Sequence, residues 1–98
     1  MKQGRLARQV EQTSLAILAA EQQIRVLEDQ VQVWSEMRDD LHTRSLVSET
    51  PQAQQEYNAM ERQLALAVEA LSEQRTDRSS LEAVLSRLMS EWEPEVLL

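Results

Sequence analysis

The first 44 residues carry a regular line of mostly apolar side chains, spaced alternately four and three residues apart. The line consists of Leu6, Val10, Thr13, Ile17, Ala20, Ile24, Leu27, Val31, Trp34, Arg38 and Leu41. A mean spacing of about 3.5 residues is typical of a long helix that packs along a second helix in a coiled coil. The pattern therefore predicts a helix over about residues 3–44.

A second line with the same spacing begins after residue 50 and continues for forty residues. Its members are Ala53, Tyr57, Met60, Leu64, Ala67, Leu71, Gln74, Arg78, Leu81, Leu85, Leu88 and Trp92. We call the two lines the seams. The second seam predicts a helix over about residues 51–93, followed by a short tail over 94–98, because Pro94 is expected to end the helix.

The two seams are separated by a predicted bend over residues 45–50. Thr50 precedes Pro51, and a residue before proline is pushed out of the helical region, while proline suits the first turn of a helix. Thr50 is therefore the expected N-cap of the second helix. Leu41 and Ala53 occupy equivalent seam positions but lie twelve residues apart, which is not a multiple of seven. The broken phase argues against one unbroken helix and predicts an all-α, antiparallel two-helix coiled-coil hairpin, with residues 1–98 as a single domain.

The pairing of the two seams has two possible registers. In an antiparallel coiled coil, partner residue numbers add to a constant, and the two phases allow either 98 or 91. The register of 98 sets Leu6 beside Trp92 and Arg38 beside Met60, and it places small residues beside large ones. We prefer 98, and the sequence leaves 91 open.

The composition matches a long helix but not a thick core. The chain has 98 residues, one glycine, two prolines, 3% aromatic residues and no phenylalanine. A two-helix protein of this length buries only a narrow stripe on each helix. Further burial must come from a second copy or from another protein.

Several apolar residues lie outside both seams and would face water in a lone hairpin. They are Leu15, Leu18, Ala19, Val26, Val33 and Met37 in the first helix, and Leu66 and Val68 in the second. We interpret them as partner-binding surfaces. A homodimer that places Leu15 and Leu18 of one copy near Leu66 and Val68 of the other would form an antiparallel four-helix bundle.

The bend and the end of the second helix hold further candidates. Leu46 and Val47 either fold back over Leu41 and Tyr57 to close the seam, or form an apolar knob that binds a partner. Trp92 either fills the end of the core or contacts another protein, since tryptophan is frequent among residues that dominate binding energy.

Charge and cysteine content limit the remaining options. With 17 acidic and 10 basic residues the net charge is −7, which argues against direct binding to nucleic acid. The chain has no cysteine, and its longest continuous apolar stretch, Leu15 to Ala20, is too short for a membrane span or a signal peptide. We expect a cytoplasmic protein.

Candidate chemistry is sparse. Arg38, Gln74 and Arg78 occupy seam positions, where polar residues commonly fix the register. His42 lies three residues after Asp39, a spacing that could hold a metal but more often marks a cation near a helix end. There is no nucleophile beside a base and no glycine-rich phosphate loop, so we expect no enzymatic activity, no cofactor and no metal.

These features predict a non-enzymatic protein-protein interaction or adaptor module that binds itself and an unidentified protein. One alternative is a small acidic helical chaperone for a secretion or assembly substrate. Another is a regulator whose tip inserts into a larger machine. Asp39, Asp40 and Glu49 make the tip acidic, and such a hairpin resembles in outline the coiled-coil domain of transcript-cleavage factors, which implies insertion into an RNA polymerase channel.

Overall fold

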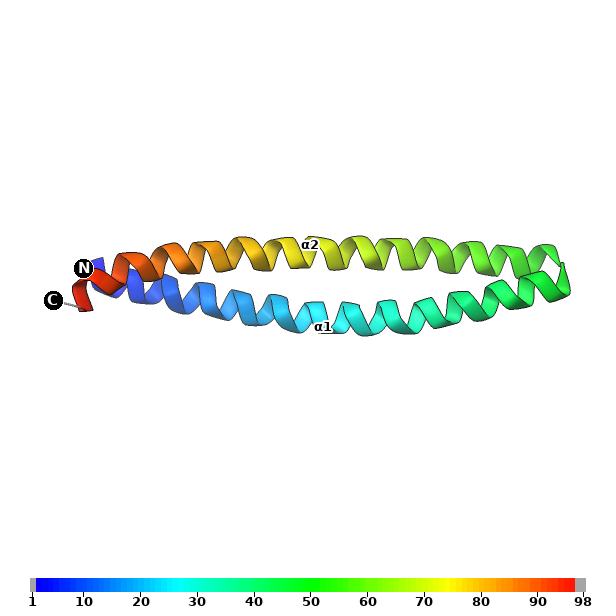
Figure 1. The fold of residues 1–98 in the computed structure, drawn as a ribbon, viewed down its shortest axis with the longest axis horizontal. Coiled ribbons are helices and arrows are strands. Elements are labelled where there is room, and N and C mark those ends of the chain that lie inside the picture. The colour runs from blue at the N-terminus through cyan, green and yellow to red at the C-terminus, as the bar shows by residue number, and fades with distance from the viewer. Residues whose placement is uncertain (1, 97–98) are drawn as a thin grey trace. The chain divides into compact units, whose positions relative to one another are not determined.

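The computed structural model describes residues 2–96, and the side chains of residues 4–92. It contains two helices, α1 (Lys2–Ser48) and α2 (Pro51–Val96), and the described residues include no strand. The helices pack against each other in an all-α helical hairpin, with the chain reversing direction between Ser48 and Pro51 (Figure 1). The predicted all-α helical hairpin is confirmed.

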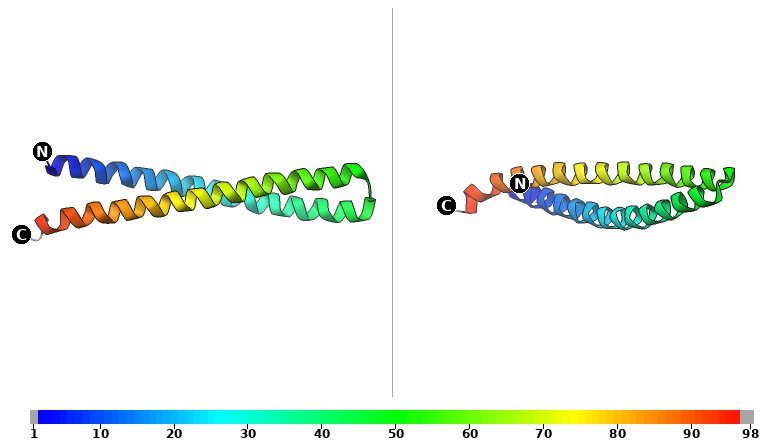
Figure 2. Two further views of the ribbon diagram at one scale, coloured as in Figure 1. Left: turned by 90° about the horizontal axis from the view of Figure 1, so that it is seen from above. Right: turned by 45° about the vertical axis from the view of Figure 1, so that its right-hand side comes forward.

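The chain divides into two compact units. The turn unit is Ile24–Glu73 and contains the connection between the helices. The terminal unit combines Met1–Gln23 with Gln74–Leu98. Both views in Figure 2 show the reversal of the chain in the turn unit, where the green end of α1 passes into the green start of α2.

Helix α1 continues to Ser48, beyond the predicted boundary near residue 44, and two hydroxyl side chains bond to its last turns. The Ser45 hydroxyl donates to the carbonyl of His42 at 2.8 Å, and the Ser48 hydroxyl donates to that of Arg44 at 2.7 Å. Both carbonyls belong to the regular backbone ladder of α1, so each hydroxyl is a second donor to a carbonyl in the last turns of the helix. Because α1 ends at Ser48, the bend is two residues long, and not the six residues 45–50.

A left-handed residue ends α1. Glu49 has a φ of 51°, and its backbone N–H donates to the carbonyl of Ser45 at 3.1 Å. A left-handed residue directly after a helix commonly closes it in this way, and glycine is its usual identity. The absence of glycine explains why the sequence pattern placed this boundary too early.

Thr50 is the N-cap of α2, as predicted. Its hydroxyl oxygen accepts a hydrogen bond from the backbone N–H of Ala53 at 3.2 Å, and its carbonyl accepts one from Gln54 at 3.2 Å. Pro51 takes the first helical position, where its missing N–H costs no hydrogen bond.

Replacing Thr50 with alanine is expected to destabilise the hairpin by about 1 kcal/mol, because the N–H of Ala53 loses its side-chain acceptor. Urea unfolding followed by far-UV circular dichroism measures the effect. Thr43→Ala is the matched control, since the Thr43 hydroxyl only duplicates a bond to a helical carbonyl, that of Asp39. Equal losses in the two variants would show that Thr50 does not act as a cap.

The far end of α2 also differs from the prediction. Helix α2 continues through Pro94 to Val96, so Pro94 does not end it. A proline removes one backbone hydrogen bond, and only two helical residues follow it here, so little helix depends on that bond. The rest of the predicted tail, residues 97–98, lies outside the described residues.

The core of the turn unit is formed by seam residues. Ile24, Leu27 and Leu71 make a buried cluster, against which Val31 and Ala70 pack. Leu64 and Ala67 are buried in the same unit. In the terminal unit, the buried residues are Ile17, Ala20 and Leu88. Every seam residue from Leu6 to Trp92 is buried or half-buried, which confirms the choice of seam positions.

Two contacts across the turn unit report its register. Arg38 approaches Glu61, with 3.5 Å between Nε and Oε1, and the rings of His42 and Tyr57 lie 5.1 Å apart. The residue numbers of each pair add to 99. Because side chains reach neighbours one residue off the directly opposed position, these contacts fit the register of 98 and not that of 91 in this unit.

Candidate functional site

The exposed apolar side chains lie outside the seams on both helices. In the turn unit they are Val26, Val33, Met37, Leu46, Val47, Leu66 and Val68, and in the terminal unit they are Leu15, Leu18 and Met89. Nine of the ten non-aromatic candidates from the sequence are in this set, and the tenth, the small Ala19, is exposed as well. Their exposure is a property of the structure, whereas their role in binding stays a prediction.

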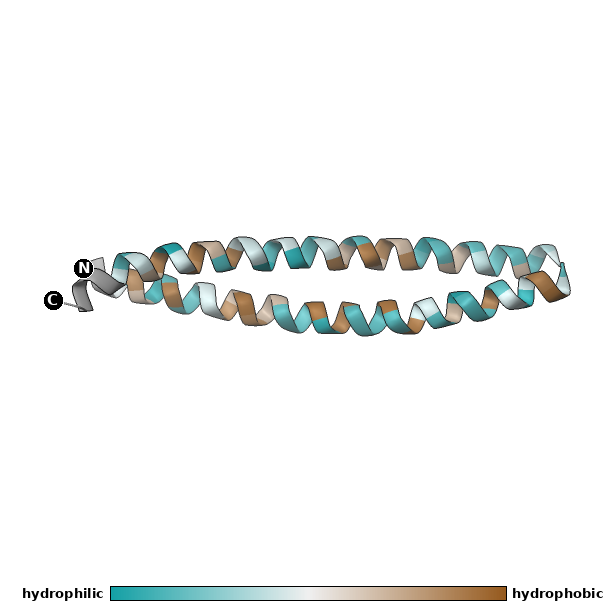
Figure 3. Ribbon diagram, viewed as in Figure 1, coloured by the Kyte–Doolittle hydropathy of each residue, from teal (hydrophilic) through white to brown (hydrophobic). Residues whose placement is uncertain are grey.

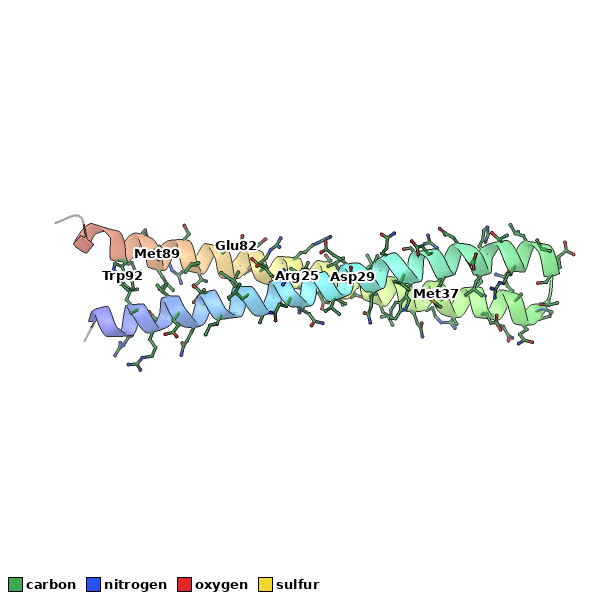
Figure 4. The ribbon with its side chains drawn as sticks, turned by 90° about the horizontal axis from the view of Figure 1, so that it is seen from below. Arg25, Asp29, Met37, Glu82, Met89 and Trp92 are labelled. Carbon is green, nitrogen blue, oxygen red and sulfur yellow. The ribbon has the colours of Figure 1, made fainter. Side chains whose placement is uncertain are left out.

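The sequence analysis overlooked Met89 and treated Trp92 as ambiguous. Met89 lies one residue after the buried Leu88, so its position outside the seam could have identified it. Trp92 is half-buried and projects from α2 toward α1 within the terminal unit (Figure 4). Trp92 therefore belongs with the seam residues and not with the exposed ones.

Along α1 in the turn unit, the exposed apolar residues share one side of the helix. Val26 and Val33 are seven residues apart, and Met37 follows Val33 by four. Residues at these spacings lie above one another on a helix. Met37 extends beside α2 in Figure 4, so this side of α1 borders the partner helix.

The end of α1 carries the most exposed apolar pair. Leu46 is 64% exposed and Val47 is 82% exposed. In Figure 3 they form the brown end of α1 next to the turn. Side chains this exposed do not fold back over Leu41 and Tyr57, so the structure favours the apolar knob over the closed seam.

Arg38 shows how a charged residue is accommodated in the seam. Its Nη2 and Nε donate to the Asp39 carboxylate at 3.1 and 3.2 Å, and Nε also faces Glu61 across the two helices at 3.5 Å. The guanidinium group thus has carboxylate partners on both helices. This arrangement fits a residue that fixes the alignment of the helices.

Arg78, in the terminal unit, is less well satisfied. Its Nε is buried without a hydrogen-bond partner, and the Glu82 carboxylate lies 3.6 Å away, beyond hydrogen-bond distance. Glu82 lies one turn further along α2, and its side chain is labelled in Figure 4. A buried N–H without a partner lowers stability, because it has lost its hydrogen bond to water.

Tyr57 has the one clearly shifted pKa among the described residues. Desolvation of the phenol raises its pKa above the usual 10.0, and the nearby Glu61 carboxylate raises it further by charge and by accepting a hydrogen bond. Arg38 acts in the opposite direction, since its positive charge favours the phenolate. The phenol is therefore held in its neutral form beside Arg38, Glu61 and His42.

Replacing Glu61 with glutamine is expected to lower the pKa of Tyr57 toward 10.0, because the variant removes the negative charge that opposes ionisation. Tyr57 is the only tyrosine in the chain, so ultraviolet absorbance during an alkaline titration reports this group alone. Glu56→Gln is the control, since Glu56 contributes nothing to the shift. An unchanged or higher pKa in Glu61→Gln would contradict the proposed cause.

Among residues 4–92, whose side chains the structure describes, no three or more histidine, aspartate or glutamate side chains are grouped so that they could hold a metal ion. Neither described helix has an apolar stretch that is long enough to cross a membrane.

Comparisons with protein-family models, with curated protein sequences and with solved structures find no match to this chain.

Proposed function

We propose that this chain is a non-enzymatic interaction module that binds protein helices through the apolar side chains beside its seams. The observation that carries this proposal is the set of ten large apolar residues that remain at least 42% exposed while the seams are covered. Contiguous exposed apolar surface on a folded protein is typical of a binding site. A hairpin of two helices offers such surface along its whole length, because each seam covers only one stripe.

The proposal includes self-association into a homodimer. Leu15 and Leu18 of one copy would lie near Leu66 and Val68 of the other, so that two hairpins form an antiparallel four-helix bundle. Burying these four side chains removes apolar surface from water in both copies, which favours association.

Sedimentation equilibrium at tens of micromolar tests the self-association. The unmodified chain is expected to sediment as a dimer, and Leu15→Gln with Leu18→Gln is expected to shift it to monomer. Met89→Gln is the control, because Met89 is exposed but lies outside the proposed contact. A monomeric unmodified chain would remove the homodimer from the proposal.

The knob of Leu46 and Val47 supports a second contact, with a different protein, at the turn. Affinity capture from cells, with Leu46→Ser and Val47→Ser, tests this contact. Loss of a captured protein in this variant, and its retention in Gln55→Ser, would identify the turn as a binding surface. Retention in both variants would favour the alternative of a chaperone that uses the long sides of its helices.

A further inference from the structure

In addition to the seams, one side of the turn unit carries two further lines of regularly spaced residues, one on each helix. On α1 these residues are Val26, Gln30, Val33 and Met37, and on α2 they are Ala59, Gln63, Leu66 and Ala70. Within each helix the intervals again alternate between four and three. We call this set the uncharged side, because none of its eight residues carries a charge.

The eight residues lie on the same side of the helix pair. Gln30 and Met37 directly precede seam residues of α1, and Gln63 and Ala70 directly precede seam residues of α2. In an antiparallel pair, a two-fold rotation normal to the plane of the helices relates such positions, so they fall on one side. Ala70 accordingly packs against the Ile24, Leu27 and Leu71 cluster from the edge of the seam.

The opposite side of the turn unit is charged. Glu61 and His42 each directly follow a seam residue, and they make the contacts with Arg38 and Tyr57. Arg25, Glu28 and Asp39 belong to the same side by their spacing. Beside residues 26–37 and 59–70 the two sides therefore differ in chemistry, and the same spacing continues the uncharged side into the charged Asp40, Glu56 and Glu73 at its ends.

The spacing of the uncharged side identifies the shape of its occupant. Intervals of four and three keep a stripe facing a helix that runs alongside, as they do in the seams. Val26 and Val33 are 52% and 50% exposed, so much of their surface is open to a third helix. An extended strand would instead require a period of two.

Charges around the uncharged side identify the chemistry of its occupant. Its acidic neighbours are Asp29, Glu36, Asp40, Glu56, Glu69 and Glu73, and its basic neighbours are Arg44 and Arg62. Arg44 already lies 3.9 Å from Asp40. A second copy that docked by the same side would bring the same acidic border against this one, and like charges across an interface disfavour association. The proposed homodimer uses only Leu66 of this side, opposite Leu15 and Leu18 of the other copy. Lysine and arginine beside the apolar stripe of a partner helix would instead complement the border.

We propose that the uncharged side of the turn unit binds one amphipathic helix of another protein, whose apolar stripe is bordered by basic residues. The complex is a three-helix bundle in which α1 and α2 supply two of the helices. This inference rests on the proposed interaction function and assigns the partner of that surface. The helical shape of the partner is inferred from the heptad spacing of the uncharged side, and its basic charge is inferred from the acidic border.

Two synthetic helical peptides about three heptads long test the proposal, with the same leucine and isoleucine stripe and with either lysine or glutamate along its borders. Binding to the full chain is measured by isothermal titration calorimetry. The lysine peptide is expected to bind at least about ten-fold more tightly than the glutamate peptide, and added salt is expected to weaken it. Equal affinity for the two peptides would overturn the proposed role of the border.

Substitutions locate the bound peptide. Val26→Gln with Val33→Gln is expected to weaken the lysine peptide by about ten-fold, since two apolar contacts are lost. Met89→Gln is the control, because Met89 is 42% exposed but lies in the terminal unit, outside the uncharged side and outside the proposed dimer contact. An equal loss in Met89→Gln would place the peptide elsewhere and overturn the proposal. Circular dichroism confirms that each variant is helical.

Charge variants separate a local border from the general negative charge of the chain. Asp29→Asn with Glu69→Gln is expected to reduce the preference for the lysine peptide by several-fold, and Glu11→Gln with Glu91→Gln, which removes the same charge in the terminal unit, is not. An equal reduction in both pairs would overturn the local assignment.

The outcomes also separate this inference from the proposed function. If neither peptide binds and Val26→Gln with Val33→Gln abolishes dimer formation, the occupant is a second copy, so the inference fails while the interaction function stands. If neither peptide binds and no exposed apolar substitution alters self-association or capture from cells, both fail.

Discussion

Replacing Leu71 with alanine is expected to lower the free energy of unfolding by about 2–5 kcal/mol. Leu71 is 6% exposed and packs with Ile24 and Leu27 in the one buried cluster of the turn unit. Truncation removes apolar contacts and leaves a space that two helices packed along one narrow stripe cannot readily close. For a thin two-helix core, a loss of this size is a large share of the total stability.

Leu66→Ala is the matched control for Leu71→Ala, because it makes the same chemical change five residues earlier in α2. Leu66 is 67% exposed, so its truncation is expected to cost less than about 0.5 kcal/mol. Urea unfolding of both variants at a low concentration, where self-association is minimal, measures the difference. Similar losses would show that Leu71 and Leu66 do not differ in burial as the structure has them.

The alternation of four-residue and three-residue intervals between apolar positions was sufficient to predict both helices, their antiparallel packing and the buried positions. This prediction succeeded because, in a core made of two helices, the heptad position of each residue decides whether it faces the other helix or the solvent. Thr50 and Pro51 fixed the start of α2 because local hydrogen bonding and backbone geometry decide a helix N-terminus.

The end of α1 was not predictable to the same degree. Glutamate rarely adopts the left-handed backbone found at Glu49, so no residue type in the sequence marks the end of α1 at Ser48. The extra turn beyond residue 44 also decided the orientation of Leu46 and Val47. Because they remain in the helix, their side chains point away from the seam instead of folding over it.

The candidate surface was predictable only in part. Exposed apolar positions follow from the seams by exclusion, so Val26, Val33 and Leu66 could be named in advance. Their division between two sides of the turn unit required the observed contacts of Arg38 and His42, which mark the charged side. A list of exposed residues therefore becomes an interaction surface only after the direction of packing is known.

Replacing Arg78 with leucine is expected to raise the free energy of unfolding by about 1–2 kcal/mol. The variant removes the buried Nε that lacks a hydrogen-bond partner, and it gives up only an exposed pairing with Glu82 at 3.6 Å. A leucine at this seam position continues the apolar line toward Leu85, one heptad further along α2. Chemical unfolding at several protein concentrations measures the gain.

Arg38→Leu is the control that isolates the role of the unsatisfied nitrogen. Arg38 also occupies a seam position, but its guanidinium donates to Asp39 and faces Glu61, so its replacement sacrifices interactions that Arg78 lacks. We expect a smaller gain or a loss for Arg38→Leu. If Arg78→Leu destabilises the chain as much as Arg38→Leu does, the guanidinium of Arg78 must be satisfied in solution, and the terminal unit must pack differently around it.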